Sequence, residues 1–489
     1  MQQIAQRVLT PIGARSAEDA GRFVATGGGI EQRSVNFLNA LFENAIASGA
    51  SDVHLEMDLI DGTEVRLRRG GTLELLPDVF EPDCARVAKT KICAKAKLDD
   101  LERLIPQDGR MMLYMVGRRV DVRVAITPTV SGYKLVMRLL DSSNVRTDID
   151  DLDMPLMVKE TMKRLSSQPE GMMLISGPTG SGKTTTLYAL LQYLKDETRH
   201  IVTIENPVEY AVKSFTQMGV DGNMTFAKAM RASLRLDPDI IMVGEMRDEE
   251  SASIAQKAGT SGHMVLSTIH ANSAAESITR LMAFGVRGFE IAQVLSAVIA
   301  QRLVKRISAD AVVHWREPND VEREWLATRN MDYPGIRLPL IFSGGYVGML
   351  PLVEMIEVTA PLRRLLEGGN GDESAWQTQV LEIASEQEQF ESLAQAGVRA
   401  VLQGKTTLDE VMRCTRESSC IPSSCRWEQI LIYRGLLSVE CLETARQDIH
   451  KARKLGHIVG LQQALIDRGF CTEIQILEAM NMSGQTKKN

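Results

Sequence analysis

The feature that most constrains how this chain can fold is a glycine-rich segment at residues 177–184. Its sequence, GPTGSGKT, has the required residue at every fixed position of the pattern G-x-x-x-x-G-K-[S/T]. A short apolar run, MMLI at 172–175, precedes the segment, and residues 185–194 follow it with a helical pattern. A strand, a glycine-rich loop and a helix in this order form a phosphate-binding loop, so the surrounding region, 150–415, is predicted to be an α/β domain.

Three further apolar runs indicate other strands of this domain, at 201–204, 240–243 and 264–267. Helical patterns lie between and after these runs. Alternating strands and helices are typical of a parallel sheet whose faces are covered by helices. The expected fold class of this region is therefore α/β.

The chemistry of residues 177–184 predicts that they bind ATP. Glycine residues let backbone N–H groups close around phosphates, and the N-terminus of the following helix adds partial positive charge. Lys183 is expected to neutralise the β- and γ-phosphates, and the hydroxyl of Thr184 is expected to bind Mg²⁺. A chance match to the pattern is the alternative, and the strand and helix on either side argue against it. The predicted ATP-binding residues of the loop are Gly177, Pro178, Thr179, Gly180, Ser181, Gly182, Lys183, Thr184 and Thr185.

Hydrolysis also needs a group that orients the attacking water. Glu245 follows the predicted strand 240–243, and Glu205 follows the strand at 201–204. Ligands of parallel sheets bind at the carboxyl edge of the strands, so both are candidates, although each could be only a solvated acid at the end of a strand. His263 and His270 bracket the next strand and suggest a sensor of bound phosphate, although a lone histidine is more often structural.

Arginine residues form the third group of candidates. Guanidinium groups stabilise the charge on a transferred phosphoryl group, and they often come from a neighbouring subunit. The alternative for each is an ordinary surface arginine. The candidates are Arg123 and Arg138 before residue 145, and Arg231, Arg235 and Arg247 in the α/β domain.

The residues before the α/β domain predict a smaller α+β domain at 31–145, after a flexible segment at 1–30. Ser34 is expected to cap an amphipathic helix that ends at Gly49. A strand, a hairpin, a second helix and three more strands are expected after it, in that order. The predicted bounds are 50–56 for the strand, 64–75 for the hairpin, 84–98 for the helix, and 111–116, 119–126 and 133–139 for the last strands.

Composition limits the class of protein further. The net charge of −7 over 489 residues argues against a dedicated nucleic-acid binder. No run of roughly 18 apolar residues occurs, so no membrane span is expected. Residues 1–19 contain no long apolar stretch, so no signal peptide is expected. The seven cysteines include no C-x-x-C pair, which favours free thiols in a reducing cytoplasm. The cysteines with the closest spacing, Cys414, Cys420 and Cys425, are interpreted as ordinary thiols because structural zinc usually uses tighter pairs.

Nine segments of the sequence are more specific than a phosphate loop alone. They are ASDVHLE at 50–56, PQDGR at 106–110, VDVRV at 120–124, KLVMRLLD at 134–141, GPTGSGKTTTLYAL at 177–190, VTIENPVEY at 202–210, MRASLRLDPDIIMVGEMRDEESA at 230–252, GHMVLSTIHAN at 262–272 and AQRLVKR at 300–306. Together, and in this order, they resemble the type II secretion and type IV pilus assembly ATPase family, a group of hexameric motor ATPases. The resemblance covers about residues 34–415.

This resemblance implies a RecA-like ATPase core, a smaller PAS-like α+β domain before it, and ATP and Mg²⁺ at the site between them. It implies that Glu245 is the catalytic carboxylate. The residues expected around Mg²⁺ and the phosphates are Glu205, Glu209, His263 and His270, and those expected to reach the γ-phosphate are Arg123 and Arg138.

The resemblance also implies a cytoplasmic homohexamer at the inner face of the bacterial inner membrane. Domain rotation during hydrolysis would act on a polytopic platform protein in that membrane, which adds pilin subunits to a pilus or pseudopilus. Association with the membrane would be peripheral, through this partner, and no direct contact with nucleic acid is expected.

The sequence departs from the family pattern at several places. Asn206 stands where the family usually has Asp, and Ala271 replaces a common Thr. Residues 307–350 contain no cysteine, so the four-cysteine zinc element of many members is expected to be absent. Residues 420–489 are extra and helical in pattern, and they resemble an N-terminal domain of relatives. A docking module, a helical cap and a nucleotide-binding module remain alternatives for them.

Three other functions remain open at this point. The same core occurs in pilus retraction motors and in DNA-export motors of conjugation systems. Asn206 leaves a third alternative, a catalytically silent scaffold, although the intact Lys183, Thr184 and Glu245 argue against it. Assembly is favoured by the motifs before residue 145.

Overall fold

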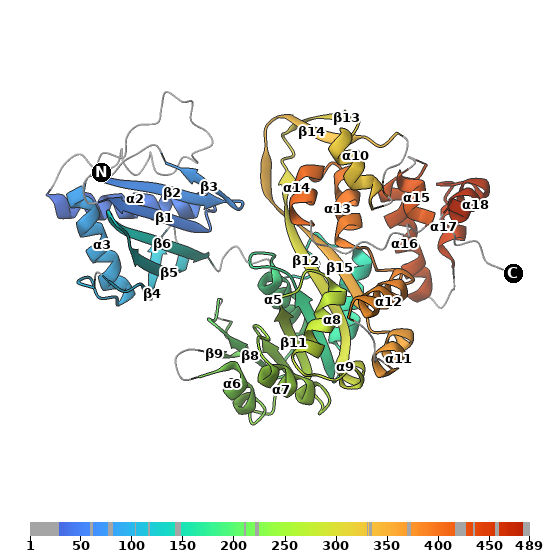
Figure 1. Cartoon of the computed structure of the whole chain (residues 1–489), viewed down its shortest axis with the longest axis horizontal. Coiled ribbons are helices and arrows are strands. Elements are labelled where there is room, and N and C mark those ends of the chain that lie inside the picture. The colour runs from blue at the N-terminus through green and yellow to red at the C-terminus, as the bar shows by residue number, and fades with distance from the viewer. Residues whose placement is uncertain are drawn as a thin grey trace. The chain divides into compact units, whose positions relative to one another are not determined.

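The chain divides into two compact units, Met1–Val145 and Arg146–Asn489 (Figure 1). In this computed structural model the described residues are 29–482, with gaps at 59–61, 77–81, 103, 116–117, 142–147, 210–211, 221–223, 330, 332–334, 369–372, 416–426, 434–435 and 455–458. The predictions for residues 1–28, Cys420 and Cys425 therefore lie outside the described residues. The finer division into segments 1–30, 31–145, 150–415 and 420–489 stays a prediction.

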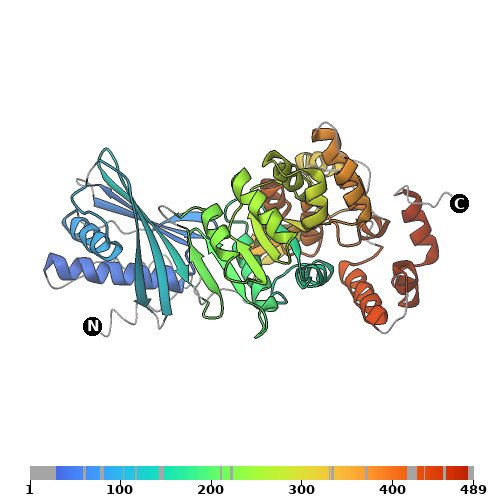
Figure 2. The ribbon, with the colours of Figure 1, turned by 90° about the horizontal axis from the view of Figure 1, so that it is seen from below.

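The first unit is a six-stranded antiparallel sheet with two helices on one face (Figure 2). Its strand order is β3-β2-β1-β6-β5-β4. Alternation explains the two faces, because Val122 and Val124 are buried under the helices whereas Arg123 between them is turned to the other side. The elements are α2 (Ile30–Ala47), β1 (Asp52–Asp58), β2 (Gly62–Arg69), β3 (Thr72–Leu75), α3 (Pro82–Ala96), β4 (Gln107–Met115), β5 (Arg118–Pro128) and β6 (Gly132–Asp141).

The first helix begins earlier than predicted, and Ser34 does not cap it. The helix α2 starts at Ile30, and Ser34 is buried in its second turn. The hydroxyl of Ser34 lies 2.8 Å from the carbonyl oxygen of Ile30 and 3.0 Å from that of Cys84, so it can donate to either. A serine hydroxyl that donates to a carbonyl oxygen of the preceding turn is compatible with the interior of a helix. The residue type of Ser34 alone therefore predicted the wrong start for this helix.

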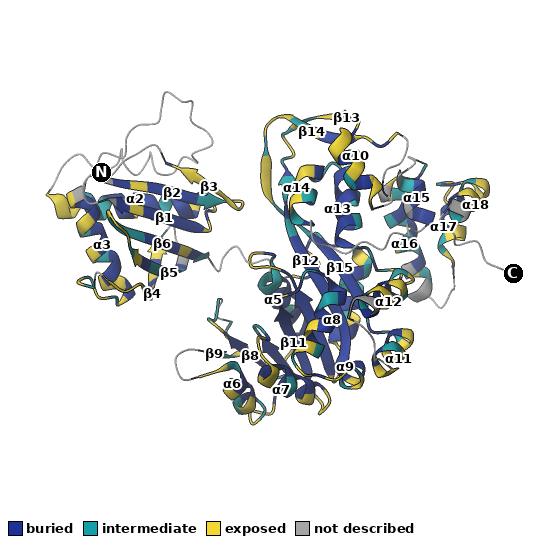
Figure 3. Cartoon of the chain, in the orientation of Figure 1, coloured by how far each residue is buried: buried dark blue, intermediate teal, exposed yellow. Residues whose placement is uncertain are grey.

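The second unit is built on a seven-stranded sheet with the order β15-β12-β7-β11-β10-β8-β9. All neighbouring strands are parallel except the edge strand β15, which runs antiparallel to β12. The central strands are buried on both faces, as Figure 3 shows by their dark colour. The strands are β7 (Gly171–Ser176), β8 (Ile201–Glu205), β9 (Thr216–Gly219), β10 (Ile240–Val243), β11 (Met264–Ile269), β12 (Leu295–Ile307) and β15 (Tyr346–Glu357).

Two separate clusters of apolar side chains pack the two faces of this sheet. One cluster contains Met173 of β7 with side chains of the helices α4 and α5. The other contains Met172 and Leu174 of the same strand with side chains of the helices α6 to α9. The predicted α/β class with a covered parallel sheet is therefore confirmed. These helices are α4 (Leu156–Ser166), α5 (Lys183–Leu194), α6 (Phe226–Ser233), α7 (Glu249–Gly259), α8 (Ala274–Ala283) and α9 (Gly288–Val294).

The rest of the second unit is a two-stranded sheet and a set of helices. The small sheet pairs β13 (Val312–Arg316) with β14 (Leu338–Ser343). Side chains of the last four helices form an apolar cluster of their own, from Trp427 to Ala479. The helices are α10 (Asp320–Ala327), α11 (Ala360–Gly368), α12 (Glu373–Ser385), α13 (Leu393–Leu402), α14 (Leu408–Cys414), α15 (Trp427–Tyr433), α16 (Val439–Lys454), α17 (Leu461–Asp467) and α18 (Glu473–Met482).

Two further sequence expectations concern membranes and thiols. In the part of the chain that the structure describes, no helix has both the length and the apolar character needed to cross a bilayer. Cys93 is buried, and burial raises the pKa of its thiol to about 11. Cys414 donates its thiol hydrogen to the carbonyl oxygen of Leu303 at 3.4 Å. Burial of Cys93 and the hydrogen bond of Cys414 to a backbone carbonyl are both typical of structural thiols.

Candidate active site

The glycine-rich segment forms the turn between β7 and α5, as predicted. Gly177 and Gly182 have φ values of +147° and +83°, which residues with a side chain rarely adopt. A Cβ at Gly177 would lie 2.5 Å from the carbonyl oxygen of Gln301, and one at Gly182 would lie 2.7 Å from the Nε2 of the same residue. Glycine is therefore required at both positions by backbone conformation and by space. The result is a backbone cradle at the N-terminus of a helix, which fits an anion.

Lys183 and Thr184 are the first two residues of α5. The Nζ of Lys183 donates to the carbonyl oxygens of Gly177 at 2.8 Å and of Pro178 at 3.0 Å. Burial lowers the pKa of Lys183 below its ordinary value, and Glu245 opposes that shift. The lysine therefore sits within electrostatic range of the carboxylate that was predicted to be catalytic.

The fit of this loop to a nucleotide can be tested on its polar atoms. The buried Oγ of Ser181 has no hydrogen-bond partner among the described residues, and buried polar groups are normally satisfied. A polyphosphate would supply acceptors for this hydroxyl, for Lys183 and for the loop N–H groups. The hydroxyl of Thr184 is an oxygen ligand of the kind that Mg²⁺ prefers.

Glu245 and His270 meet at the carboxyl edge of the central sheet. Glu245 comes two residues after β10, and His270 comes directly after β11, the neighbouring strand. The Nε2 of His270 lies 2.9 Å from Oε1 of Glu245. Ile269 pairs with Ser176, the residue before the phosphate loop, so this edge is also the edge of the loop. Lys183, Glu245 and His270 therefore share one site.

The other oxygen of Glu245 is held by an arginine from its own segment. Arg247 donates to Oε2 of Glu245 from both Nε and Nη2, each at 2.7 Å. The candidate Arg231 instead pairs with Glu250 at 2.6 Å, and Arg235 is exposed. Of the three arginine candidates in this unit, Arg247 is the one that the structure brings to the carboxylate.

Glu205 occupies the last position of β8 and is 3% exposed. The hydroxyl of Tyr188 lies 2.9 Å and 2.8 Å from its two carboxylate oxygens, and the hydroxyl of Thr203 donates to Oε1 at 2.6 Å. Tyr188 belongs to α5, so these bonds tie Glu205 to the helix that follows the phosphate loop. Glu209 lies partly exposed in the segment after β8.

His263 lies at the opposite edge of the sheet. It precedes β11, and its carbonyl oxygen accepts a hydrogen bond from the backbone N–H of Gly171, the first residue of β7. The phosphate loop follows the other end of β7, about 20 Å away at the usual rise of a strand. The structure does not bring His263 to this site, because histidines at the two ends of one strand cannot both lie at its carboxyl edge.

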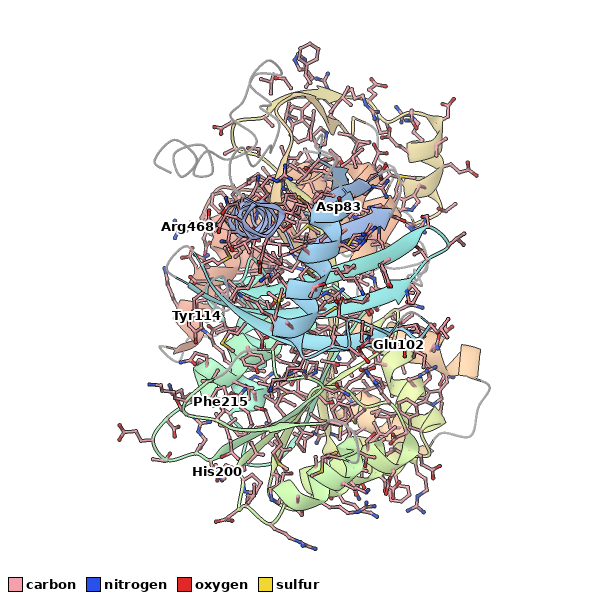
Figure 4. The ribbon with its side chains drawn as sticks, turned by 90° about the vertical axis from the view of Figure 1, so that its left-hand side faces the viewer. Asp83, Glu102, Tyr114, His200, Phe215 and Arg468 are labelled. Carbon is pink, nitrogen blue, oxygen red and sulfur yellow. The ribbon has the colours of Figure 1, made fainter. Side chains whose placement is uncertain are left out.

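The two arginine candidates of the first unit lie side by side on the open face of its sheet. Arg123 of β5 pairs directly with Arg138 of β6, and on its other side with Arg110 of β4. The Nε of Arg138 donates to Oδ1 of the buried Asp52 at 2.9 Å. We call Arg110, Arg123 and Arg138 the arginine row. Tyr114, which Figure 4 labels, is exposed on the same face.

The sequence reasoning missed several residues that contact the site. Tyr188 and Gln301 make buried hydrogen bonds to Glu205 and to the phosphate loop. Arg302 is buried beside Asn272, which follows His270 by two residues. The AQRLVKR segment was a usable signal for Gln301 and Arg302, but it was interpreted only as a marker of the family.

Comparison with known proteins identifies relatives over most of the chain. The family described as "Type II/IV secretion system protein" matches residues 31–413. The putative type II secretion system protein E of Escherichia coli K12 is 38% identical over 387 residues, which are 78% of this chain and 76% of that protein. The type IV pilus assembly ATPase PilB of Pseudomonas aeruginosa is 38% identical over 398 residues, which are 78% of this chain and 68% of that protein.

Solved structures show a similar fold. The pilus retraction motor PilT with bound ADP has a TM-score of 0.52 and 25% identity, and the match covers 76% of this chain and 95% of PilT. The ATPase DotB of Legionella pneumophila has a TM-score of 0.56 at 19% identity, with 77% of this chain and 94% of DotB covered, and this likeness concerns the fold alone. With a complete phosphate loop and a carboxylate beside it, the chain is an ATPase that belongs to the type II/IV secretion system protein family.

Proposed function

We propose that this ATPase is a cytoplasmic homohexamer that drives assembly of a type IV pilus or a type II secretion pseudopilus. The observation that carries the proposal is the pair of Glu245 and His270 at 2.9 Å beside the phosphate loop, which is an arrangement for hydrolysis rather than for binding alone. Relatives named for type II secretion and for type IV pilus assembly, each at 38% identity, support the process.

The hydrolytic step follows from the residues that meet at the site. The N–H groups of the loop hold the phosphates, and Lys183 moves from the carbonyl oxygens of Gly177 and Pro178 to the β- and γ-phosphates. Thr184 would hold Mg²⁺, which supplies charge neutralisation when it is bound. Glu245 orients the attacking water and accepts its proton. The bond between the γ-phosphorus and the oxygen that bridges to the β-phosphate breaks, and ADP leaves. His270 and Arg247 fix the two carboxylate oxygens of Glu245.

The arginine row is assigned the positive charge that stabilises the γ-phosphate during hydrolysis, in addition to that of Lys183. Arg123 and Arg138 would donate to the γ-phosphate, as guanidinium groups do in other phosphoryl-transfer enzymes. Arg138 then exchanges its bond to Asp52 for one to phosphate. The position of the first unit would thereby depend on the state of the nucleotide. This dependence would convert hydrolysis into domain rotation against a polytopic platform protein at the inner face of the bacterial inner membrane.

One alternative has a specific observation in its favour. The likeness to the retraction motor PilT covers 95% of that protein, so a retraction motor is the second candidate. Assembly is favoured because the relatives named for secretion and pilus assembly are more similar in sequence, at 38% against 25%. A conjugative transfer motor is the third candidate.

The proposal is tested by Lys183→Ala in the native host, with Lys195→Ala, an exposed lysine at the end of α5, as the control. The variant is expected to abolish phosphate release and either surface pili or secreted proteins, and to leave conjugal transfer unchanged. Pili that persist but no longer retract would identify a retraction motor. A loss of conjugal transfer alone, or no change in any of these processes, would overturn the proposal. Sedimentation of the purified chain with ATP is expected to show six copies.

A further inference from the structure

Gln301 lies on β12 beneath the phosphate loop and is 2% exposed. The preceding residue, Ala300, pairs with Ser176, the last residue before the loop. The Nε2 of Gln301 donates to the carbonyl oxygen of Ser181 at 2.7 Å, and the hydroxyl of Thr186 donates to its Oε1 at 2.9 Å. A single buried amide therefore joins the phosphate loop to the first turn of α5.

The partners of this amide fix its direction. The carbonyl oxygen of Ser181 can only accept, so it must face the NH₂ group, whereas the hydroxyl of Thr186 can donate to Oε1. Position 301 therefore needs a side chain that has both a hydrogen-bond donor and an acceptor. An ionised carboxylate of the same size offers acceptors only, so Glu would place two oxygen atoms against each other at Ser181.

The bond to Ser181 also determines where the next backbone N–H points. A trans peptide is planar, and its C=O and N–H point in opposite directions. Because the carbonyl of Ser181 points at Gln301 on β12, the N–H of Gly182 points away from β12. An N–H group with this direction in a phosphate loop is available to a phosphate oxygen. The close approaches of Gln301 to Gly177 and Gly182 leave the loop little room to take another shape.

The same strand supports the other half of the site. Arg302 is 7% exposed, and its Nη2 donates to the carbonyl oxygen of Asn272 at 2.8 Å. Asn272 follows His270 by two residues, so this bond holds the segment that carries the histidine. Successive residues of a strand point to opposite faces, which is how Gln301 and Arg302 contact two different loops.

We propose that Gln301 is a positioning residue for ATP binding and hydrolysis. Its amide holds the carbonyl of Ser181 against β12 and so keeps the N–H of Gly182 directed at the phosphates. Gln301 contacts no nucleotide itself and acts through Ser181. Gln301 thereby strengthens the binding of the phosphate groups. The affinity for adenosine, which has no phosphates, does not depend on Gln301.

The test compares Gln301→Glu with Gln387→Glu in the full-length chain. Gln387 is the matched control, because its amide also bridges backbone groups, accepting from the N–H of Glu357 at 2.9 Å and donating to its carbonyl oxygen at 2.8 Å, away from the phosphate loop. The dissociation constants of ATP, ADP and adenosine are measured together with kcat and thermal unfolding. For Gln301→Glu the constants of ATP and ADP are expected to rise about tenfold or more, since a charge-assisted hydrogen bond is lost.

The control is expected to lower the unfolding temperature by a similar amount while it leaves the nucleotide constants unchanged. A Gln301→Glu protein that binds ATP as tightly as the wild type, or that loses affinity only as the control does, would overturn the proposal. Thr186→Val provides a second variant in case Gln301→Glu does not fold. It removes the donor to Oε1 and keeps the side-chain volume, so a smaller loss of ATP affinity in the same direction is expected. Unchanged ATP affinity in this variant would also count against the proposal.

Discussion

The Nε2 of His270 lies 2.9 Å from Oε1 of Glu245, and Arg247 holds the other oxygen of the same carboxylate at 2.7 Å. The three side chains come from the ends of two neighbouring parallel strands, beside the loop that contains Lys183. A carboxylate fixed at both oxygen atoms keeps one orientation. Such an orientation suits the placement of a water molecule for attack on a phosphate.

The first prediction concerns the two histidines. His270→Asn removes the contact that orients Glu245, so kcat is expected to fall roughly tenfold to a hundredfold, the cost of a small misplacement of a reacting group. His263→Asn is the matched control, because His263 lies at the opposite edge of the sheet. Steady-state phosphate release measures both variants. Equal losses of kcat in the two variants would contradict the claim that His270 acts at the site and that His263 does not.

The second prediction concerns the arginine row. Arg138→Ala is expected to lower kcat by about tenfold or more, because phosphoryl-transfer enzymes depend strongly on such guanidinium groups. Arg86→Ala removes another exposed arginine of the first unit and serves as the control. Phosphate release is measured alongside thermal unfolding, which Arg138→Ala is expected to lower only modestly, because Arg68 also pairs with the buried Asp52 at 3.4 Å. An Arg138→Ala enzyme with wild-type kcat would show that the arginine row does not take part in hydrolysis.

The sequence predicted the parts of the site that depend on residue type and order. The phosphate loop, the strand before it, the helix after it and Glu245 follow from a fixed motif and from residue patterns, and the structure places all of them as expected. These features are local in the chain, so pattern and spacing suffice.

Ser34, which sequence reasoning misplaced, and Gln301, which it missed, both make long-range contacts. The hydroxyl of Ser34 finds a partner in Cys84, 50 positions away, and Gln301 contacts a loop 120 positions before it. His263 was misplaced for a different reason, because the two ends of its strand were not distinguished. Amino and carboxyl ends of parallel strands are different sites, and ligands bind at the latter.

The third prediction concerns the buried bond between Tyr188 and Glu205. Tyr188→Phe leaves a buried carboxylate with one donor fewer, so the free energy of unfolding is expected to fall by about 1–3 kcal/mol. Tyr193→Phe on the same helix is the control, because Tyr193 is exposed. Chemical denaturation measures both variants. A loss in Tyr193→Phe as large as that in Tyr188→Phe would contradict this account of the bond.

The fourth prediction concerns pH and Asp153. Burial raises the pKa of this carboxyl group, but Lys405 and Arg306 outweigh burial, so its pKa in the folded chain lies below the ordinary 3.8. A lowered pKa stabilises the fold at pH values above the ordinary one, and this stabilisation is lost as the pH falls through the folded value. Asp153→Asn is therefore expected to lower the free energy of unfolding by about 1 kcal/mol at pH 7.

The difference between the wild type and Asp153→Asn should shrink as the pH is lowered below 3.8. Asp310→Asn, at an exposed position, is the control and should match the wild type at every pH. Denaturant titrations at pH 7 and at successively lower pH values provide the comparison. A difference that stays constant over this range would contradict the assignment of the effect to the charge of Asp153.

The most direct test of the account is single-turnover phosphate release by Glu245→Gln, measured together with ATP binding in the presence of Mg²⁺. The substitution keeps the size of the side chain and removes its charge, so ATP affinity is expected to stay near the wild-type value while the rate of hydrolysis falls by about 10²- to 10⁴-fold. Glu250→Gln, an exposed acid on α7, serves as the control and should hydrolyse ATP at the wild-type rate. A Glu245→Gln enzyme that hydrolyses ATP as fast as the wild type would contradict the assignment of Glu245 as the group that activates water.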